Sequence, residues 1–86
     1  MEETENLLVS IVKSLVDIPE AVAVSSAVDG NGVVYRISVD PSDVGKLIGK
    51  QGRTARALRT IFGAISTKTQ RRIFIDISTT LDESGS

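Results

Sequence analysis

The sequence predicts an α+β fold of two layers, in which helices pack against a mixed three-stranded sheet. Apolar side chains recur at helical spacing in some segments and at alternate positions in others, in the order helix, strand, strand, helix, helix, strand. A chain of 86 residues is long enough for one such core. We therefore expect a single domain over residues 1–80 and a disordered tail over residues 81–86.

The first helix is expected over about residues 4–16. Acidic residues at its start suit the positive end of the helix dipole, and Pro19 follows its end. Its apolar stripe consists of Leu8, Ile11, Val12, Leu15 and Val16. This spacing is typical of an amphipathic helix with one face on the protein core.

Two strands joined by a tight turn follow the helix. Apolar residues occupy alternate positions, first at Val22, Val24 and Val28 and then at Val33, Tyr35, Ile37 and Val39. Between the two runs lies the loop Asp29-Gly30-Asn31-Gly32. Its glycines and asparagine tolerate the positive φ angles of such a turn, so the pattern predicts an antiparallel β-hairpin.

A pair of helices separated by a glycine loop comes next. Pro41 opens a short helix that runs through Ile48, and Ser42 or Asp43 is placed to cap its first amide groups. The second helix is expected over residues 53–65, with Gly63 near its end.

A polar loop over residues 66–70 precedes the third strand. In this strand Ile73, Ile75 and Ile77 alternate with Arg72, Phe74 and Asp76. Because two helices separate it from the second strand, the connection is long enough to make these two strands parallel.

The sequence lacks the residues on which most catalytic and metal sites depend. It contains no cysteine and no histidine, and therefore neither a thiolate nor the commonest general base and metal ligand. No apolar stretch approaches the roughly 18 residues of a membrane span, and the N-terminus is acidic. We expect a cytoplasmic protein that is not an enzyme and binds neither cofactor nor metal.

Charge is strongly segregated along the chain although the net charge is only −1. Residues 44–75 contain eight basic side chains and no acidic one, whereas the remainder carries eleven acids against Lys13 and Arg36. Solvation alone is the simpler explanation for a run of charges. So uneven a distribution instead favours an anion-binding surface.

The loop Gly49-Lys50-Gln51-Gly52 places two glycines three positions apart between the two helices. Glycine permits a tight turn and lets an anion approach the backbone amides, and free amides at the start of the second helix add to the attraction. A P-loop needs four residues between its glycines and Ser or Thr after its lysine. Here Gly45 and Gly49 enclose three residues and Gln51 follows Lys50, so this motif is excluded. A dinucleotide fingerprint beginning at Gly45 would need glycine at Leu47.

A pair of glycines can also serve only to connect two helices, but the second helix favours a binding site. Arg53, Arg56 and Arg59 share one helical face, which starts at the loop. The expected buried face is separate and consists of Ala55, Leu58, Phe62 and Ile65. An arginine face beside the loop suits a chain of phosphates.

The segment Ile48-Gly49-Lys50-Gln51-Gly52 resembles the Ile-Gly-x-x-Gly signature of KH domains, and residues 49–60 are similar to the KhpA-like family of bacterial single-KH-domain proteins. The element order resembles the type II arrangement, which implies three helices on one face of the sheet. The resemblance implies a non-enzymatic regulator or RNA chaperone that binds about four unpaired nucleotides with modest sequence specificity. Ala55 departs from the signature, which commonly has a larger aliphatic residue there.

The candidate RNA-binding residues are those of the loop, its flanks and the start of the last strand. They are Lys46, Ile48, Gly49, Lys50, Gln51, Gly52, Arg53, Arg56, Arg71 and Arg72. We expect bases to meet aliphatic side chains such as Ile48 and Ile73, because three aromatic residues are too few for a stacking platform.

Self-association is a further expectation. Ala57, Ile61 and Ala64 lie off the buried and arginine faces of the second helix and form a candidate dimer interface. The resemblance implies a homodimer or a complex with a second KH-domain protein. The competing interpretation is that this patch packs under the N-terminal helix. Two other functions stay open, namely a module used only for protein assembly and a protein that binds single-stranded DNA.

Overall fold

Six main elements follow the predicted order. The computed structural model describes residues 2–78, so the expected tail over residues 81–86 lies outside the described residues. The elements are α1 (Glu2–Leu15), β1 (Ala23–Asp29), β2 (Gly32–Ser38), α2 (Val44–Ile48), α3 (Arg53–Thr69) and β3 (Arg72–Ile77). No helix in this described part is long and apolar enough to cross a membrane.

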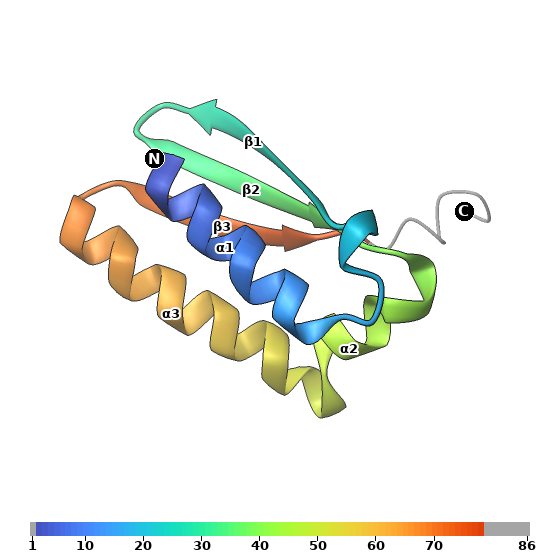
Figure 1. The fold of residues 1–86 in the computed structure, drawn as a ribbon. Helices are drawn as coiled ribbons and strands as arrows, with labels where there is room; N and C mark the ends of the chain where they lie inside the picture. The colour runs from blue at the N-terminus through green and yellow to red at the C-terminus, as the bar shows by residue number, and fades with distance from the viewer. Residues whose placement is uncertain (1, 79–86) are drawn as a thin grey trace.

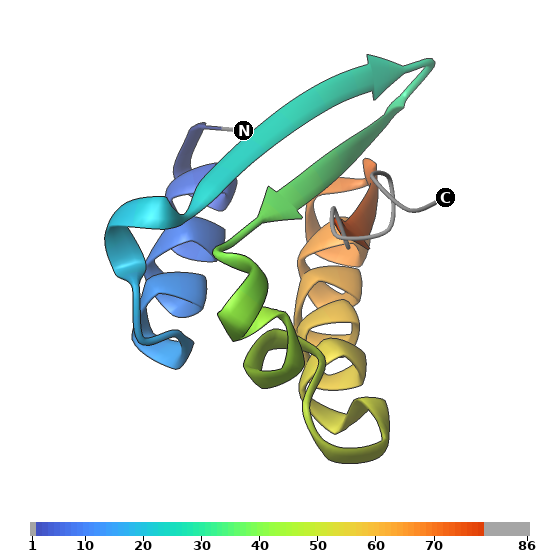
Figure 2. The same cartoon turned by 90° about the vertical axis from the view of Figure 1, so that its right-hand side faces the viewer.

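The strands form one mixed sheet in the order β1-β2-β3. β1 and β2 pair antiparallel, and β2 and β3 pair parallel, as the lengths of their connections predict. The helices lie against one face of the sheet, with α1 and α3 side by side across the strands (Figure 1). The turned view shows that the other face carries no helix (Figure 2). The predicted two-layer α+β class is confirmed.

The core fills the space between the sheet and the helices. β2 is the central strand, and Val33, Tyr35 and Ile37 point from it into this space. The buried apolar residues are Leu8, Val12, Val16, Val33, Tyr35, Ile37, Val39, Leu47, Ala55, Leu58, Phe62 and Ile75. Alternate residues of the strands face the open side, where Arg36 donates to Asp76 at 3.0 Å. The predicted alternation therefore holds in β2 and β3.

The hairpin turn uses only one positive φ angle. Gly30 has φ +65°, whereas Asn31 and Gly32 have no positive φ, a pattern that fits a type II′ turn with glycine at its first central position. Of the two glycines and the asparagine expected to supply such angles, only Gly30 does so. Gly32 meets a different constraint, because a Cβ there would lie 3.3 Å from Cβ of Arg72 on β3.

The predicted cap of the short helix was also wrong. The carboxylate of Asp40, one residue before Pro41, accepts from the backbone N–H of Ser42 at 3.0 Å and from its hydroxyl. These hydrogen bonds hold the pKa of Asp40 below its usual value. Residues Pro41–Asp43 form a single 3₁₀ turn, and α2 begins after it.

Asp43 has a tertiary role instead of a capping role. Its side chain is 1% exposed, and its Oδ2 accepts from the backbone N–H of Ile18 at 3.0 Å. Ile18 lies in the connection from α1 to β1, 25 residues away in the chain. One hydrogen bond therefore ties this connection to the start of the helix pair.

The second long helix extends past its predicted end. Residues 66–69 continue α3 instead of forming a loop, and Gly63 lies within the helix. Hydroxyl groups in this last turn bond back to the helix, Thr67 to Gly63 O at 3.2 Å and Thr69 to Ile65 O at 3.0 Å. Polar composition misled the prediction because threonine satisfies its hydroxyl inside a helix in this way. Gln70 ends the helix with φ +61°.

We expect Asp43→Ala to lower the free energy of unfolding by about 2 kcal/mol, because the part-buried amide of Ile18 loses its acceptor and a buried side chain is removed. Urea unfolding followed by circular dichroism measures the effect. Asp43→Asn keeps a carbonyl oxygen and should retain most of the stability. Asp40→Ala removes the exposed cap and should cost less than Asp43→Ala. Equal losses for the two alanine variants would contradict the structural role of Asp43.

Candidate nucleic-acid interface

The loop between α2 and α3 depends on backbone angles that favour glycine. Gly49 has φ +81° and ψ 169°, and Gly52 has φ +75°. Gln51 between them has φ +56°, in the left-handed region. The turn closes through two backbone hydrogen bonds, Gly49 N to Gly45 O at 2.8 Å and Gly52 N to Gly49 O at 3.1 Å. The predicted glycine loop is therefore a tight turn that redirects the chain.

The two glycines meet different requirements. A Cβ at Gly49 would contact Oγ1 of Thr54 and lie 2.7 Å from the backbone nitrogen of Thr54, so this position has no room for a side chain. A Cβ at Gly52 would lie no closer than 4.0 Å to Arg56, and only its positive φ favours glycine. Gly49 thus brings the end of α2 directly against the first turn of α3.

The N-terminus of α3 is open toward the loop. Gly52 occupies the N-cap position and has no side chain to cap the helix, and the backbone N–H of Arg53 donates to Lys50 O. The remaining amides of the first turn and the positive end of the helix dipole attract an anion. Lys50 and Gln51 are exposed, and Nη2 of Arg56 donates to Gln51 O at 3.2 Å. Arg56 therefore braces the loop from the helix side.

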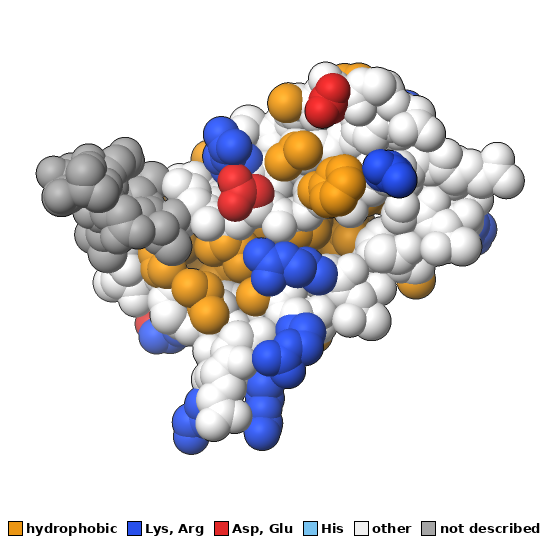
Figure 3. Space-filling view, turned by 180° about the vertical axis from the view of Figure 1, so that it is seen from behind, with side chains coloured by type: hydrophobic (Ala, Val, Ile, Leu, Met, Phe, Trp, Pro, Cys, Tyr) orange, Lys and Arg blue, Asp and Glu red, His pale blue; other side chains and the backbone are white. Residues whose placement is uncertain are grey.

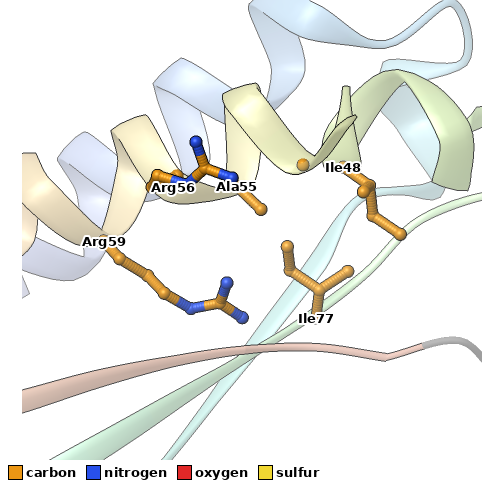
Figure 4. A pocket seen from close by; sticks show the side chains of 6 residues that line it. Ile48, Ala55, Arg56, Arg59 and Ile77 are labelled. Atoms are coloured by element: carbon orange, nitrogen blue, oxygen red, sulfur yellow. The ribbon is translucent and has the colours of Figure 1, made fainter. Parts of the chain in front are cut away.

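A cavity of about 360 Å³ lies beside the loop. Its lining residues are Ile48, Gly52, Ala55, Arg56, Arg59 and Ile77. Ile48, Ala55 and Ile77 give it an apolar floor, and the two arginines reach toward the cavity from α3 (Figure 4). We call this cavity the groove. Seen from behind, an apolar hollow lies next to a group of basic side chains (Figure 3).

Ile48, Gly52 and Arg56 belong to the predicted set and line the groove, whereas Ile77 was missed and takes the place expected for Ile73. Both isoleucines pack against the core, but Ile73 does not line the groove. The reason is strand direction. β3 returns along α3, which starts at the loop, and so the end of β3 lies near the loop. The order of elements could have predicted that the end of β3 lies near the loop, because a strand that follows a packed helix returns along it.

Arg59 and Ala55 were assigned to the arginine and buried faces of the helix but not to the site. Both line the groove. Ala55 is buried, and its short side chain leaves space in the floor of the groove where the KH signature commonly has a larger residue. A helical projection separates two faces of α3 but does not show that β3 passes alongside them.

Other predicted residues lie away from the groove. Nζ of Lys46 pairs with Asp17 at 3.3 Å and is not among the lining residues. Arg53 and Lys50 are exposed beside the loop. Arg72 is exposed at the start of β3, about 25 Å from the loop along the length of α3. The groove and Arg72 therefore belong to opposite ends of the helix.

Arg71 faces the core side of the sheet. Its Nε is buried and has no hydrogen-bond partner within residues 2–78. Burial and the charge of Glu5 raise the pKa of Tyr35, and the charge of Arg71 opposes them, so these groups lie near one another. Alternation along the strand explains this placement, because Arg71 has the same parity as the inward residues Ile73 and Ile75.

The candidate dimer patch of Ala57, Ile61 and Ala64 is on the surface of α3. All three side chains are exposed, and Ile61 is 45% exposed. The competing interpretation, in which the patch packs under the N-terminal helix, was therefore wrong. Sequence spacing could not decide this, because it does not show which side of α3 meets α1.

Comparisons with known proteins agree with this arrangement. The KhpA/KhpB KH-domain family model matches residues 5–77. The RNA-binding protein KhpA of Oceanobacillus iheyensis is 48% identical over 71 residues, which cover 83% of this chain and 95% of that protein. The KhpA proteins of Halalkalibacterium halodurans and Clostridium acetobutylicum are 48% and 42% identical over 73 residues, covering 85% of this chain and 96% and 97% of theirs. No solved structure matches the chain.

The family match spans every element from α1 to β3, and the Ile-Gly-x-x-Gly segment forms the loop between α2 and α3 in the structure. The sequence relationship and the fold therefore agree over the same residues, and this chain belongs to the KhpA/KhpB KH-domain family.

Proposed function

We propose that this protein binds single-stranded RNA in the groove without catalysing a reaction. The observation that carries the proposal is the placement of an apolar floor between an open helix N-terminus and β3. Phosphates would lie against the loop amides and Lys50, and bases would lie over the apolar floor. The relatives that share 42–48% identity are named RNA-binding protein KhpA, which supports the same class of ligand.

A short apolar groove beside a backbone-binding loop suits modest sequence specificity. Contacts to phosphate carry no information about sequence, and the groove accommodates only part of a strand. We infer that the protein acts on many RNAs as a post-transcriptional regulator or RNA chaperone. A module used only for assembly would not need a helix start without a side-chain cap beside basic side chains that, within residues 2–78, pair with no acid. Competition between RNA and DNA strands of one sequence tests the remaining alternative.

We further propose that α3 mediates pairing with a second copy or with another KH-domain protein. Ile61 is a large apolar side chain on an exposed helix surface, and Ala57 and Ala64 beside it would let another helix approach closely. Two joined grooves would raise avidity for one RNA strand without new contacts in either groove. The family description names two KH proteins, KhpA and KhpB, which supports pairing between KH domains.

Replacing both Lys50 and Gln51 with aspartate should weaken binding to single-stranded RNA at least about tenfold, because two acids at the loop repel phosphate. Both side chains are exposed, so the fold should survive. Fluorescence anisotropy with a labelled oligonucleotide measures affinity, and circular dichroism checks folding. Unchanged affinity in a folded double variant would remove the loop from the binding site. The parent should also lose affinity steeply with added salt, and a flat response would exclude backbone contacts.

Gly49→Ala should destabilise the loop and weaken RNA binding, because the new Cβ meets the backbone of Thr54 at 2.7 Å. The matched control is Gly45→Ala in α2. A Cβ at Gly45 has nothing within 4 Å, and alanine favours a helix. The control should therefore fold at least as stably as the parent and keep its affinity. Thermal unfolding and anisotropy of both variants test this, and equal behaviour of the two would contradict the steric role of Gly49.

Ile61→Asp should give a folded monomer, because a charge at the proposed interface cannot be buried without a partner. Val28→Asp is the matched control, since Val28 is also a large exposed apolar residue but lies on β1, away from α3. Light scattering at tens of micromolar should show a dimer for the parent and for this control. A monomeric parent, or a dimeric Ile61→Asp variant, would refute the interface without affecting the RNA site.

A further inference from the structure

Arg59 is the arginine of the groove whose guanidinium has no partner among residues 2–78. It lies on α3 and reaches toward the cavity from the side opposite Ile77 on β3 (Figure 4). Within the described part of the chain its guanidinium donates no hydrogen bond and pairs with no carboxylate. Arg56, the other arginine of the lining, donates to Gln51 O. The two arginines therefore differ, because one braces the loop and the other is available to a ligand.

The nearby acid of β3 is already engaged. Asp76 precedes Ile77 but faces the open side of the sheet, where it pairs with Arg36 at 3.0 Å. Residues 44–75 contain no acid at all. The charge and the donors of Arg59 thus remain unsatisfied beside an apolar floor, where a ligand group that accepts hydrogen bonds would bind.

The position of Arg59 favours a base over a phosphate. It lies seven residues after Gly52, about 10 Å along the helix from the loop. The loop amides, Lys50 and Arg53 are placed for the phosphates at the helix start. Arg59 instead lies opposite Ile77, across the apolar floor on which a base would rest.

Guanidinium chemistry then selects among the bases. Arginine has only donors, and two of its N–H groups point in parallel, so they match two adjacent acceptors on one edge of a base. Guanine has O6 and N7, and cytosine has O2 and N3. Adenine places an amino donor beside N7 and N1, and uracil places N3–H between its two carbonyl oxygens.

We propose that Arg59 is the specificity-determining residue of the groove and selects a base with two adjacent acceptors, guanine or cytosine, over adenine and uracil. This inference rests on the proposed RNA-binding function. It assigns a base preference at one nucleotide position. The other positions of the strand accept any base because the protein contacts their phosphates.

The test uses four labelled RNA octamers, a uridine octamer and three versions with one central guanine, cytosine or adenine. Anisotropy gives the affinity of the parent for each. The version with guanine or the version with cytosine should bind at least about fivefold more tightly than the uridine octamer and the adenine version. Replacing guanine with 7-deazaguanine, or cytosine with 3-deazacytosine, removes one acceptor. Loss of the preference with one of these analogues identifies which base the groove selects.

Three variants distinguish base recognition by the guanidinium of Arg59 from attraction by its positive charge. Arg59→Lys keeps the charge but loses the parallel donors, so it should bind the uridine octamer within about twofold of the parent and show no base preference. Arg59→Gln offers one donor and one acceptor, which match adenine, and should shift the preference to adenine. Arg36→Lys makes the same chemical change on the open face of the sheet, outside the groove lining, and should keep the parental preference.

Two outcomes overturn the proposal while leaving RNA binding intact. One is equal affinity of the parent for all four octamers, which would assign Arg59 to a phosphate contact. The other is a preference that survives in a folded Arg59→Lys variant. Failure of the parent to bind any octamer would instead overturn the proposed function of the groove.

Discussion

The contact between Gly49 and the first turn of α3 determines how the groove is built. Because no Cβ intervenes, Gly49 approaches the backbone of Thr54, and the chain reverses within a few residues. This reversal leaves the start of α3 without a side-chain cap from Gly52 and directs the helix back along the sheet. β3 then returns past the same helix, so that Ile77 joins Ala55 and Ile48 in the apolar floor of the groove. A side chain at Gly49 would therefore disturb the turn, the direction of α3 and the position of β3 beside it.

Electrostatic balance within the molecule leaves the groove positive. Two acidic residues form salt bridges outside the groove lining. Asp17 pairs with Lys46, and Asp76 pairs with Arg36. Both pairs are exposed, so each contributes little to stability, but each occupies a carboxylate close to the groove elements. The groove lining itself contains Arg56 and Arg59 and no acidic residue. A net charge of −1 therefore coexists with a locally positive groove.

α3 serves three separate purposes on three of its faces. Leu58 and Phe62 fill the core, Arg56 and Arg59 border the groove, and Ile61 lies on free surface. Helical periodicity keeps these faces apart, so a partner helix on Ile61 would leave the groove open to RNA. The proposed RNA binding and the proposed pairing therefore use separate faces of one helix, and pairing would add a second groove to the first.

The sequence by itself determined the element types, their order, the mixed sheet and the glycine loop, because spacing, turn chemistry and connection length act over short stretches of chain. Only the tertiary structure decided what depends on packing between distant segments. Asp43 bonds to Ile18, Arg59 lines the groove, and Ile77 rather than Ile73 borders it. Each of these outcomes depends on which segment lies alongside another, and no local pattern of side chains contains that information.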